Sequence, residues 1–346
     1  MIVQCIDWPS EWSPLSIGDD IVDAAPRLAA HQDHWMNSLC DGFGHRGFLL
    51  RAIDDDDVVG LLPLVLVSGP IFGKFLVSLP YLNTGGVWAR STDAALALID
   101  RACDLADELD VKHLELRHEQ NIEHPKFNFQ RTDKVHMRLD LPATDEDLER
   151  MLKSKVRSQI RKSNEHHLSV EFGKMELVDD FHNVFARNMR DLGTPVFSKK
   201  LFQSIINHFA DDAEFCVVRQ SGRTIASGLL IHTDGCTEVP SASSLRSFNR
   251  TNANMLMYRS LLRRAIERGS QTFDFGRSSV GSGTYKFKSQ WGAGPHAACW
   301  QYYVRKGDPN DMRPDAGGKQ RLVKIWQRLP VWLTKTIGPT IVRGIP

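Results

Sequence analysis

The chain has 346 residues, about twice the length of a common single domain, so we expect two domains. Hydrophobic residues make up 42% and charged residues 25% of the sequence, and this ordinary globular composition excludes collagen, coiled-coil and disordered classes. The 43 Lys and Arg residues balance 42 Asp and Glu residues, so no net field marks the whole chain as a nucleic-acid-binding protein.

The cysteine, histidine and hydropathy patterns indicate the cellular compartment in which the protein is expected. Six cysteines are scattered without a CxxC pair, and the 13 histidines form no HExxH pair, so we expect reduced thiols and no metal site. The first residues lack the basic start and apolar core of a secretory signal. The longest uncharged run, between Asp57 and Lys74, is too short to span a bilayer. These features favour a cytoplasmic protein.

The first half of the chain alternates predicted strands and helices. Strands are expected at 47–53, 58–67, 111–117 and 134–141, the first two joined as a hairpin by a turn at 54–57. Ser91 is expected to cap a helix that runs to about Leu109. A second helix is expected from Thr144 to about Asn164, with Asp147 as capping-box partner.

The second half repeats this cycle. Strands are expected at 168–173, 238–243, 272–276 and 297–304, a hairpin at 215–232 with its turn at 221–222, and helices at 179–191, 198–209 and 252–268. Because both halves run hairpin, strand or loop, helix, strand, we expect a duplicated α/β domain. The expected division is 1–150, then 151–308 carrying the motifs, then a basic tail at 309–346.

Two glycine motifs are rejected as nucleotide-binding loops. Residues 42–47 spell GxGxxG, but a helix is expected before them and a strand after them, the reverse of a dinucleotide fingerprint. Residues 219–222 faintly resemble an acyl-CoA pyrophosphate loop. They occupy a hairpin turn, which lacks the backbone N–H groups of a helix start.

A basic stripe marks the helix expected at 144–164. At helical spacing Arg150, Lys153, Arg157 and Arg161 form one row beside an apolar row, and Lys162 follows. Like charges four residues apart repel, so helix stability alone does not favour this row. Either acidic residues elsewhere in the fold balance a solvated face, or the row contacts a phosphate or nucleic-acid backbone.

The segment 188–199 leaves a predicted helix through a glycine-proline turn. It displays Arg190, Asp191, Thr194 and Lys199 around that turn, which suits the holding of a substrate. The alternative is a helix end with a local Arg–Asp pair.

The segment 273–293 carries the densest chemistry. A predicted buried strand delivers Asp274 and then Arg277 to its end, where ligands of α/β proteins usually bind. Tyr285 and two further aromatic residues then alternate with Lys286 and Lys288. This alternation indicates either an amphipathic strand with outward lysines or a cation placed where negative charge develops.

These three segments together resemble proteins of the FemAB type, which are tandem GNAT-fold transferases. The residues that carry the likeness are KSKVRSQIRKS (153–163), NMRDLGTPVFSKKLF (188–202) and FDFGRSSVGSGTYKFKSQWGA (273–293). Within this type, the chain most resembles the branch encoded with exosortase (PEP-CTERM) and exopolysaccharide loci. The resemblance extends from about Trp35 to Tyr303.

The resemblance implies two GNAT-like α/β domains with mixed sheets. It also implies an aminoacyl-tRNA donor, no tightly bound cofactor, and an acceptor amine on a nucleotide- or lipid-linked precursor. By the same resemblance Lys288 stabilises the oxyanion. Direct attack on an activated ester needs an oriented amine, and we expect Asp274 or Asp191 to orient or deprotonate it. The resemblance implies that Arg190 and Asp191 bind the precursor and that Arg157, Arg161 and Lys162 contact tRNA or phosphate. From their own segments we expect Thr194, Lys199, Arg277 and Tyr285 to contact substrate as well.

Two other functions stay open at this point. One is a conventional acyl-CoA-dependent GNAT N-acetyltransferase of polysaccharide biosynthesis, which the missing pyrophosphate loop disfavours. The other is a non-catalytic binding component of that machinery. The tail from Lys319 to Pro346 holds six basic and no acidic residues among apolar ones. It is expected either to contact the inner membrane peripherally or to dock on the body of the protein.

Overall fold

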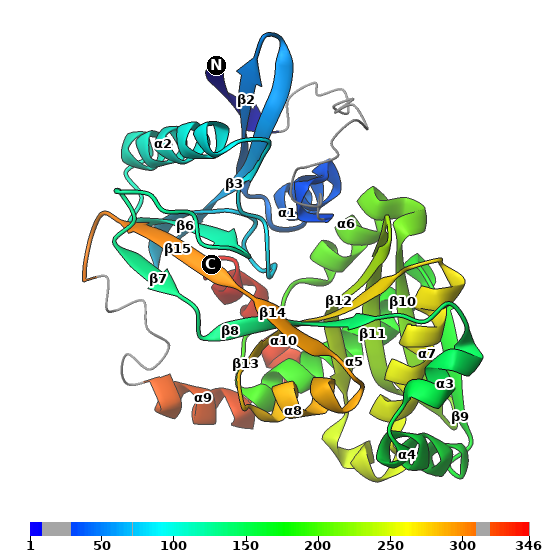
Figure 1. Cartoon of the computed structure of the whole chain (residues 1–346). Helices are drawn as coiled ribbons and strands as arrows, with labels where there is room; N and C mark the ends of the chain where they lie inside the picture. The colour runs from blue at the N-terminus through cyan, green and yellow to red at the C-terminus, as the bar shows by residue number, and fades with distance from the viewer. Residues whose placement is uncertain (9–28, 71, 309–318, 346) are drawn as a thin grey trace. The chain divides into compact units, whose positions relative to one another are not determined.

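The structure is a computed structural model that describes residues 1–8, 29–70, 72–308 and 319–345. Those residues form two compact units (Figure 1), each made of more than one chain segment. Unit 1 comprises 1–133, 297–318 and 340–346, and unit 2 comprises 134–296 and 319–339.

Unit 1 is built on an eight-stranded sheet. Its main strand order is β1-β2-β3-β4-β6-β15-β7, and β5 pairs with β3. Helix α2 begins at the predicted Ser91 cap, whose Oγ accepts from Ala94 N at 3.2 Å, and it packs on β2, β3 and β6. The bounds are β1 Ile2–Trp8, α1 Asp33–Phe43, β2 Arg46–Asp54, β3 Asp57–Gly69, β4 Gly73–Val77, β5 Trp88–Ala89, α2 Thr92–Glu108, β6 His113–His118, β7 Phe129–Arg131 and β15 Cys299–Val304.

Unit 2 contains a seven-stranded sheet in the order β14-β8-β13-β12-β11-β10-β9. The strands are β8 Lys134–Asp140, β9 Leu168–Gly173, β10 Ala213–Gln220, β11 Arg223–Thr233, β12 Cys236–Ser244, β13 Thr272–Ser279 and β14 Gly294–Ala297. The helices are α3 Asp145–Met151, α4 Ser154–Asn164, α5 Val178–Leu192, α6 Lys199–Phe209, α7 Ala253–Glu267, α8 Gly283–Gln290, α9 Lys319–Arg328 and α10 Val331–Val342, the last of which runs on into unit 1.

The two units repeat one topology, as the duplicated pattern predicts. In unit 1 the antiparallel strands β2-β3-β4 are followed by α2 and by β6, which pairs with β4 in parallel. In unit 2 the antiparallel strands β10-β11-β12 are followed by α7 and by β13, which pairs with β12 in parallel. The helix in each case provides the long connection that parallel neighbours require.

The unit boundaries differ from the contiguous ranges 1–150, 151–308 and 309–346. Strand β8 lies before position 150, yet it pairs with β13 of unit 2, and β15 lies before 308, yet it pairs with β6 and β7 of unit 1. Each unit thus takes a strand from the chain segment assigned to the other, because hydrogen bonding across a sheet does not follow chain order. Residues 309–318 of the expected tail lie outside the described residues.

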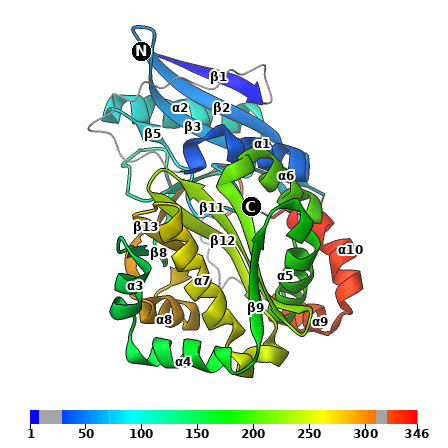
Figure 2. The ribbon, with the colours of Figure 1, turned by 90° about the vertical axis from the view of Figure 1, so that its right-hand side faces the viewer.

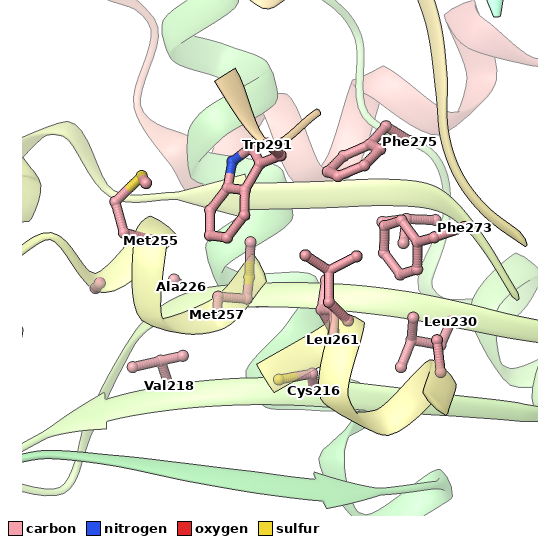
Figure 3. Close-up of a cluster of buried hydrophobic side chains, with 14 of the residues drawn as sticks. Cys216, Val218, Ala226, Leu230, Met255, Met257, Leu261, Phe273, Phe275 and Trp291 are labelled. Atoms are coloured by element: carbon pink, nitrogen blue, oxygen red, sulfur yellow. The ribbon is translucent and has the colours of Figure 1, made fainter. Parts of the chain in front are cut away.

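Hydrophobic side chains pack on both faces of the sheet of unit 2. Phe215 of β10 stacks on Phe181 of α5, while the next residue, Cys216, joins the cluster around Leu261 of α7 (Figure 3). Alternate side chains of a strand point to opposite faces, so α5 and α7 cover opposite sides of this sheet (Figure 2). Trp291, just after α8, closes the α7 side of the core.

Two predicted elements are corrected by the structure. The helix expected from 144 to 164 is divided into α3 and α4, because Leu152 adopts an extended conformation and buries its side chain in the core. The alternating segment after Ser282, for which an amphipathic strand is one of the two alternatives, is the helix α8. Phe287 and Trp291 are four residues apart and therefore share one helix face, against Tyr258 of α7.

Candidate functional site

The sheet of unit 2 opens between β12 and β13. These parallel strands pair only from Cys236–Thr272 to Glu238–Asp274. Beyond that point β12 stays on β11 as far as Ser244, and β13 stays on β8 as far as Ser279. We call the diverging segments 239–244 and 275–279 the fork. Their facing edges do not pair with each other, and unpaired strand edges offer hydrogen bonds to an extended ligand.

Lys288 lies beside the β13 arm of the fork. Ser282 caps α8 by accepting from Tyr285 N, and the helix then directs Lys288 Nζ to the carbonyl oxygens of Gly276 and Arg277, each at 3.0 Å. The side chain is only 8% exposed. Burial lowers the pKa of Lys288 to about 8, although the Asp274 carboxylate opposes this shift. An ammonium has three N–H donors, so one donor is left beyond these two carbonyls.

Asp274 binds the backbone turn at Gly276, which carries one of the carbonyl groups that Lys288 binds. Its Oδ1 accepts from Gly276 N at 2.6 Å and its Oδ2 accepts from Arg138 Nε at 2.9 Å. Gly276 has a φ of 76°, in the left-handed region that suits glycine, and it sits where the β13–β8 register shifts. Both oxygens of Asp274 are therefore engaged, one with the Gly276 turn and one with Arg138.

Two arginines that the sequence analysis did not select lie between β12 and α7. Arg246 and Arg250 are exposed, and neither forms an ion pair with a described residue. The 15-residue helix α7 begins directly after them, behind Asn252, whose side chain makes no capping bond. Ala253 N donates to Thr251 Oγ1 at 3.3 Å and Met255 N donates to Asn252 O at 2.9 Å, so the helix dipole and the two arginines are what attract anions at this start. A strand, an arginine-rich loop and a helix in succession were visible in the sequence and could have indicated this site.

Only part of the predicted basic row lies on a single helix, α4. Arg157 is half-buried and donates to Glu149 O at 3.4 Å, while Arg161 and Lys162 are exposed without an ion pair to a described residue. Arg150 belongs instead to α3, where it pairs with Asp147, because the chain breaks between the two helices. Helix α4 packs against α7, so these cations flank the helix that begins at the fork.

The predicted substrate residues fall into two groups. Arg277 and Tyr285 lie with Asp274 and Lys288 on β13 and α8, so the structure brings these four together. The residues at 188–199 form the second group, and their charged side chains form ion pairs within unit 2. Arg190 Nε donates to Asp191 Oδ1 at 2.7 Å. Lys199 Nζ donates to Asp179 Oδ1 at 2.8 Å, and Thr194 is exposed beside Gly193.

The tail docks on unit 2 at that same turn. Arg190 Nη1 donates to Leu329 O at 3.0 Å, and Gln327 Nε2 donates to Asp191 O at 3.1 Å. These bonds join α5 to α9 and account for much of the hydrogen-bonding capacity of the Arg190–Asp191 pair. No helix in the described part of the chain is both long and apolar enough to cross a membrane.

Unit 1 has a hollow at the position that corresponds to the fork. Strands β4 and β6 pair in parallel only at Leu76–Leu114 and Val77–Glu115. A cavity of about 700 Å³ lies beyond, lined by Gly86 before α2, by the start of α2 and by Arg117 and His118 at the end of β6. None of the residues predicted as site residues lies there.

Comparisons with known proteins agree with this architecture. Residues 129–289, which include the fork and Lys288, match a family described as acetyltransferase (GNAT) domain. A crystal structure of FemX superposes with a TM-score of 0.59 at 13% identity, covering 82% of this chain and 94% of that one. L-PGS from Bacillus licheniformis gives 0.53 at 14% identity, covering 84% and 91%. No curated protein sequence matches the chain.

A tandem GNAT protein from the clavulanic acid biosynthesis pathway also shares the fold, with a TM-score of 0.51 at 11% identity, covering 89% of this chain and all of the other. The predicted fold, two tandem GNAT-like units with mixed sheets, is therefore confirmed. The family match and the fold support an acyltransferase and a FemAB-like architecture. The exosortase-associated branch stays a prediction.

Proposed function

We propose that this chain transfers an aminoacyl or other acyl group to an amine of a cell-envelope or exopolysaccharide precursor. The observation that carries the proposal is the buried Lys288 ammonium at the fork, which gives two of its three N–H groups to backbone carbonyls. The family match over 129–289 supports acyl transfer as the class of reaction.

The proposed reaction is direct attack on the donor. The amine nitrogen bonds to the carbonyl carbon of an activated ester or thioester, and the carbonyl oxygen becomes an oxyanion. The tetrahedral intermediate collapses by breaking the bond to the leaving oxygen or sulfur. The amine loses one proton, the leaving group gains one, and an amide is formed. Orientation and oxyanion stabilisation lower the barrier for such a reaction.

In this scheme Lys288 stabilises the oxyanion with its third N–H. The two carbonyl bonds fix Nζ in place before the substrate arrives, so little reorganisation accompanies the reaction. Asp274 holds the Gly276 turn that presents one of those carbonyls, which makes it a positioning residue. Arg277 and Tyr285 are the proposed substrate contacts beside Lys288.

The anionic end of the donor is proposed to lie at the start of α7. Aminoacyl-tRNA and acyl-CoA both carry phosphates, and Arg246 and Arg250 supply cations next to the positive end of the α7 dipole. Arg157, Arg161 and Lys162 of the adjoining α4 would add contacts to a longer RNA backbone. We therefore propose aminoacyl-tRNA as the donor, with acyl-CoA as the second candidate that the same start of α7 would accept.

The double substitution Arg246→Ala/Arg250→Ala is expected to weaken donor binding about tenfold or more, because two charge-assisted phosphate contacts are lost. Fluorescence titration with aminoacyl-tRNA and with acetyl-CoA measures the effect. The matched control, Arg187→Ala/Lys200→Ala, removes two exposed cations from α5 and α6 and is expected to leave affinity unchanged. Equal losses in both double variants would show that net charge, and not the start of α7, governs binding.

A further inference from the structure

Helix α9 and the start of α10 form a surface of unit 2 that the proposed function does not use. One side of α9 is fixed on the end of α5 by the bond from Gln327 to Asp191. Val323 lies so close to Gly193 that a Cβ on that glycine would meet Val323 Cγ1 at 2.4 Å. These contacts fix the rotation of α9 about its own axis. The sides of the helix that do not contact α5 therefore face solvent.

Exposed apolar residues lie on α9, at the start of α10 and at the end of α5. Leu322 is 68% exposed, Ile325 is 59% exposed, and Trp332 at the start of α10 is 68% exposed. Leu192, at the end of α5 beside the α9 contact, is 50% exposed. Three of the nine large hydrophobic side chains that are exposed in the described residues fall within 322–332, so such side chains concentrate on this segment. We call the four residues the apolar face.

Cations border the apolar face. Arg321, Lys324 and Arg328 are exposed, and none forms an ion pair with a described residue. No acidic residue occurs from position 319 to the end of the sequence. At 3.6 residues per turn, Leu322 and Ile325 project between the docked side of α9 and this row of cations. Helices that lie in a bilayer interface have an apolar strip edged with Lys and Arg in this way.

We propose that this surface binds an anionic phospholipid bilayer, with the apolar face inserted among the acyl chains and the three cations on the headgroup phosphates. An RNA backbone would use the cations but would leave Leu322, Ile325 and Trp332 in water. A bilayer uses both, and indole rings favour the interfacial region where Trp332 would lie. The proposal is independent of the reaction assigned to the fork.

Flotation of the full chain with vesicles tests the proposal. The wild-type protein is expected to float with vesicles of phosphatidylcholine and phosphatidylglycerol at about three to one, and not with phosphatidylcholine alone. Leu322→Glu/Ile325→Glu is expected to reduce binding at least about tenfold, because two carboxylates replace the inserted side chains. The charge variant Arg321→Glu/Lys324→Glu/Arg328→Glu is expected to lose binding to a similar extent, and salt should weaken wild-type binding.

The control is Val280→Glu, which places a carboxylate at another exposed apolar position of unit 2 and is expected to bind vesicles like the wild type. Circular dichroism melting checks that each variant is folded. Failure of the wild type to float, or equal flotation of wild type and the Leu322/Ile325 variant, would overturn the proposal. So would light scattering that shows a vesicle-free dimer lost in the same variant together with no lipid binding, since the face would then join two copies.

Discussion

Replacing Lys288 with methionine is expected to lower kcat for acyl transfer by about 100-fold or more, the typical cost of removing an oxyanion donor. The donor phosphates contact other residues in this account, so KM for the donor should change less than about threefold. Steady-state kinetics of amide formation measure both quantities. Lys286→Met, an exposed position on the same helix, is the matched control and is expected to retain full activity.

The pH profile separates this role from a merely structural one. Burial lowers the pKa of Lys288 from 10.5 to about 8. The protonated form is the active form here, so kcat/KM should hold below that pH and fall as pH rises through it. The Lys288→Met variant should lack this falling limb. A variant rate within about threefold of wild type, or an unchanged alkaline limb, contradicts the oxyanion role.

Replacing Glu214 with glutamine is expected to lower the free energy of unfolding by about 3 kcal/mol at neutral pH. Glu214 of β10 is buried and accepts from Arg264 Nε at 2.7 Å and Nη2 at 3.0 Å, with His232 Nε2 at 3.0 Å from its Oε1. These bonds tie α7 to the strands beneath it. The variant removes the buried carboxylate of the half-buried Arg264 guanidinium and leaves it only the longer contact with the exposed Glu267 at 3.4 Å, which is strongly destabilising in a protected site.

The contacts of Glu214 with Arg264 and His232 also make the free energy of unfolding depend on pH, in a direction that can be predicted. Although burial acts in the opposite direction, the bonds from His232 and Arg264 lower the pKa of Glu214 from 4.5 to about 2 in the folded state. The stabilisation is therefore complete above about pH 4.5 and is lost as pH falls toward 2. Urea unfolding should show wild type and Glu214→Gln converging over that window. The control Glu165→Gln, at an exposed site, should stay within about 0.5 kcal/mol of wild type, and a constant gap down to pH 2 would contradict the assignment.

Local patterns in the sequence predicted much of unit 2 correctly. The hairpin with its turn at 221–222 is present, and Gln220 pairs with Arg223 across that turn, as expected when 219–222 was rejected as a phosphate loop. In unit 1, GxGxxG at 42–47 spans the end of α1 and the start of β2, so the expected order of helix before strand is confirmed. Thr144 caps its helix as the capping box predicts. Each of these features depends on residues within a few positions of one another.

Errors arose where distant contacts or caps override local patterns. The alternation of rings and lysines after Ser282 left an amphipathic strand open as one alternative, but the Ser282 cap starts a helix there. The docking of α9 on Arg190 and Asp191 depends on residues about 140 positions apart, which one sequence does not reveal. The fork itself is a strand-pairing property, so Asp274 and Lys288 could be selected but not placed.

The most direct test of the central claim is equilibrium binding of an acyl donor to the purified chain, using bulk aminoacyl-tRNA with acetyl-CoA as competitor. The account predicts saturable donor binding that Arg246→Ala/Arg250→Ala weakens and Lys288→Met leaves intact. If the donor is aminoacyl-tRNA, Arg157→Ala/Arg161→Ala should also weaken its binding, because only the longer RNA backbone reaches those two arginines. Saturable binding of acetyl-CoA alone would reassign the donor. Binding of neither ligand would contradict the proposed acyl transfer at the fork.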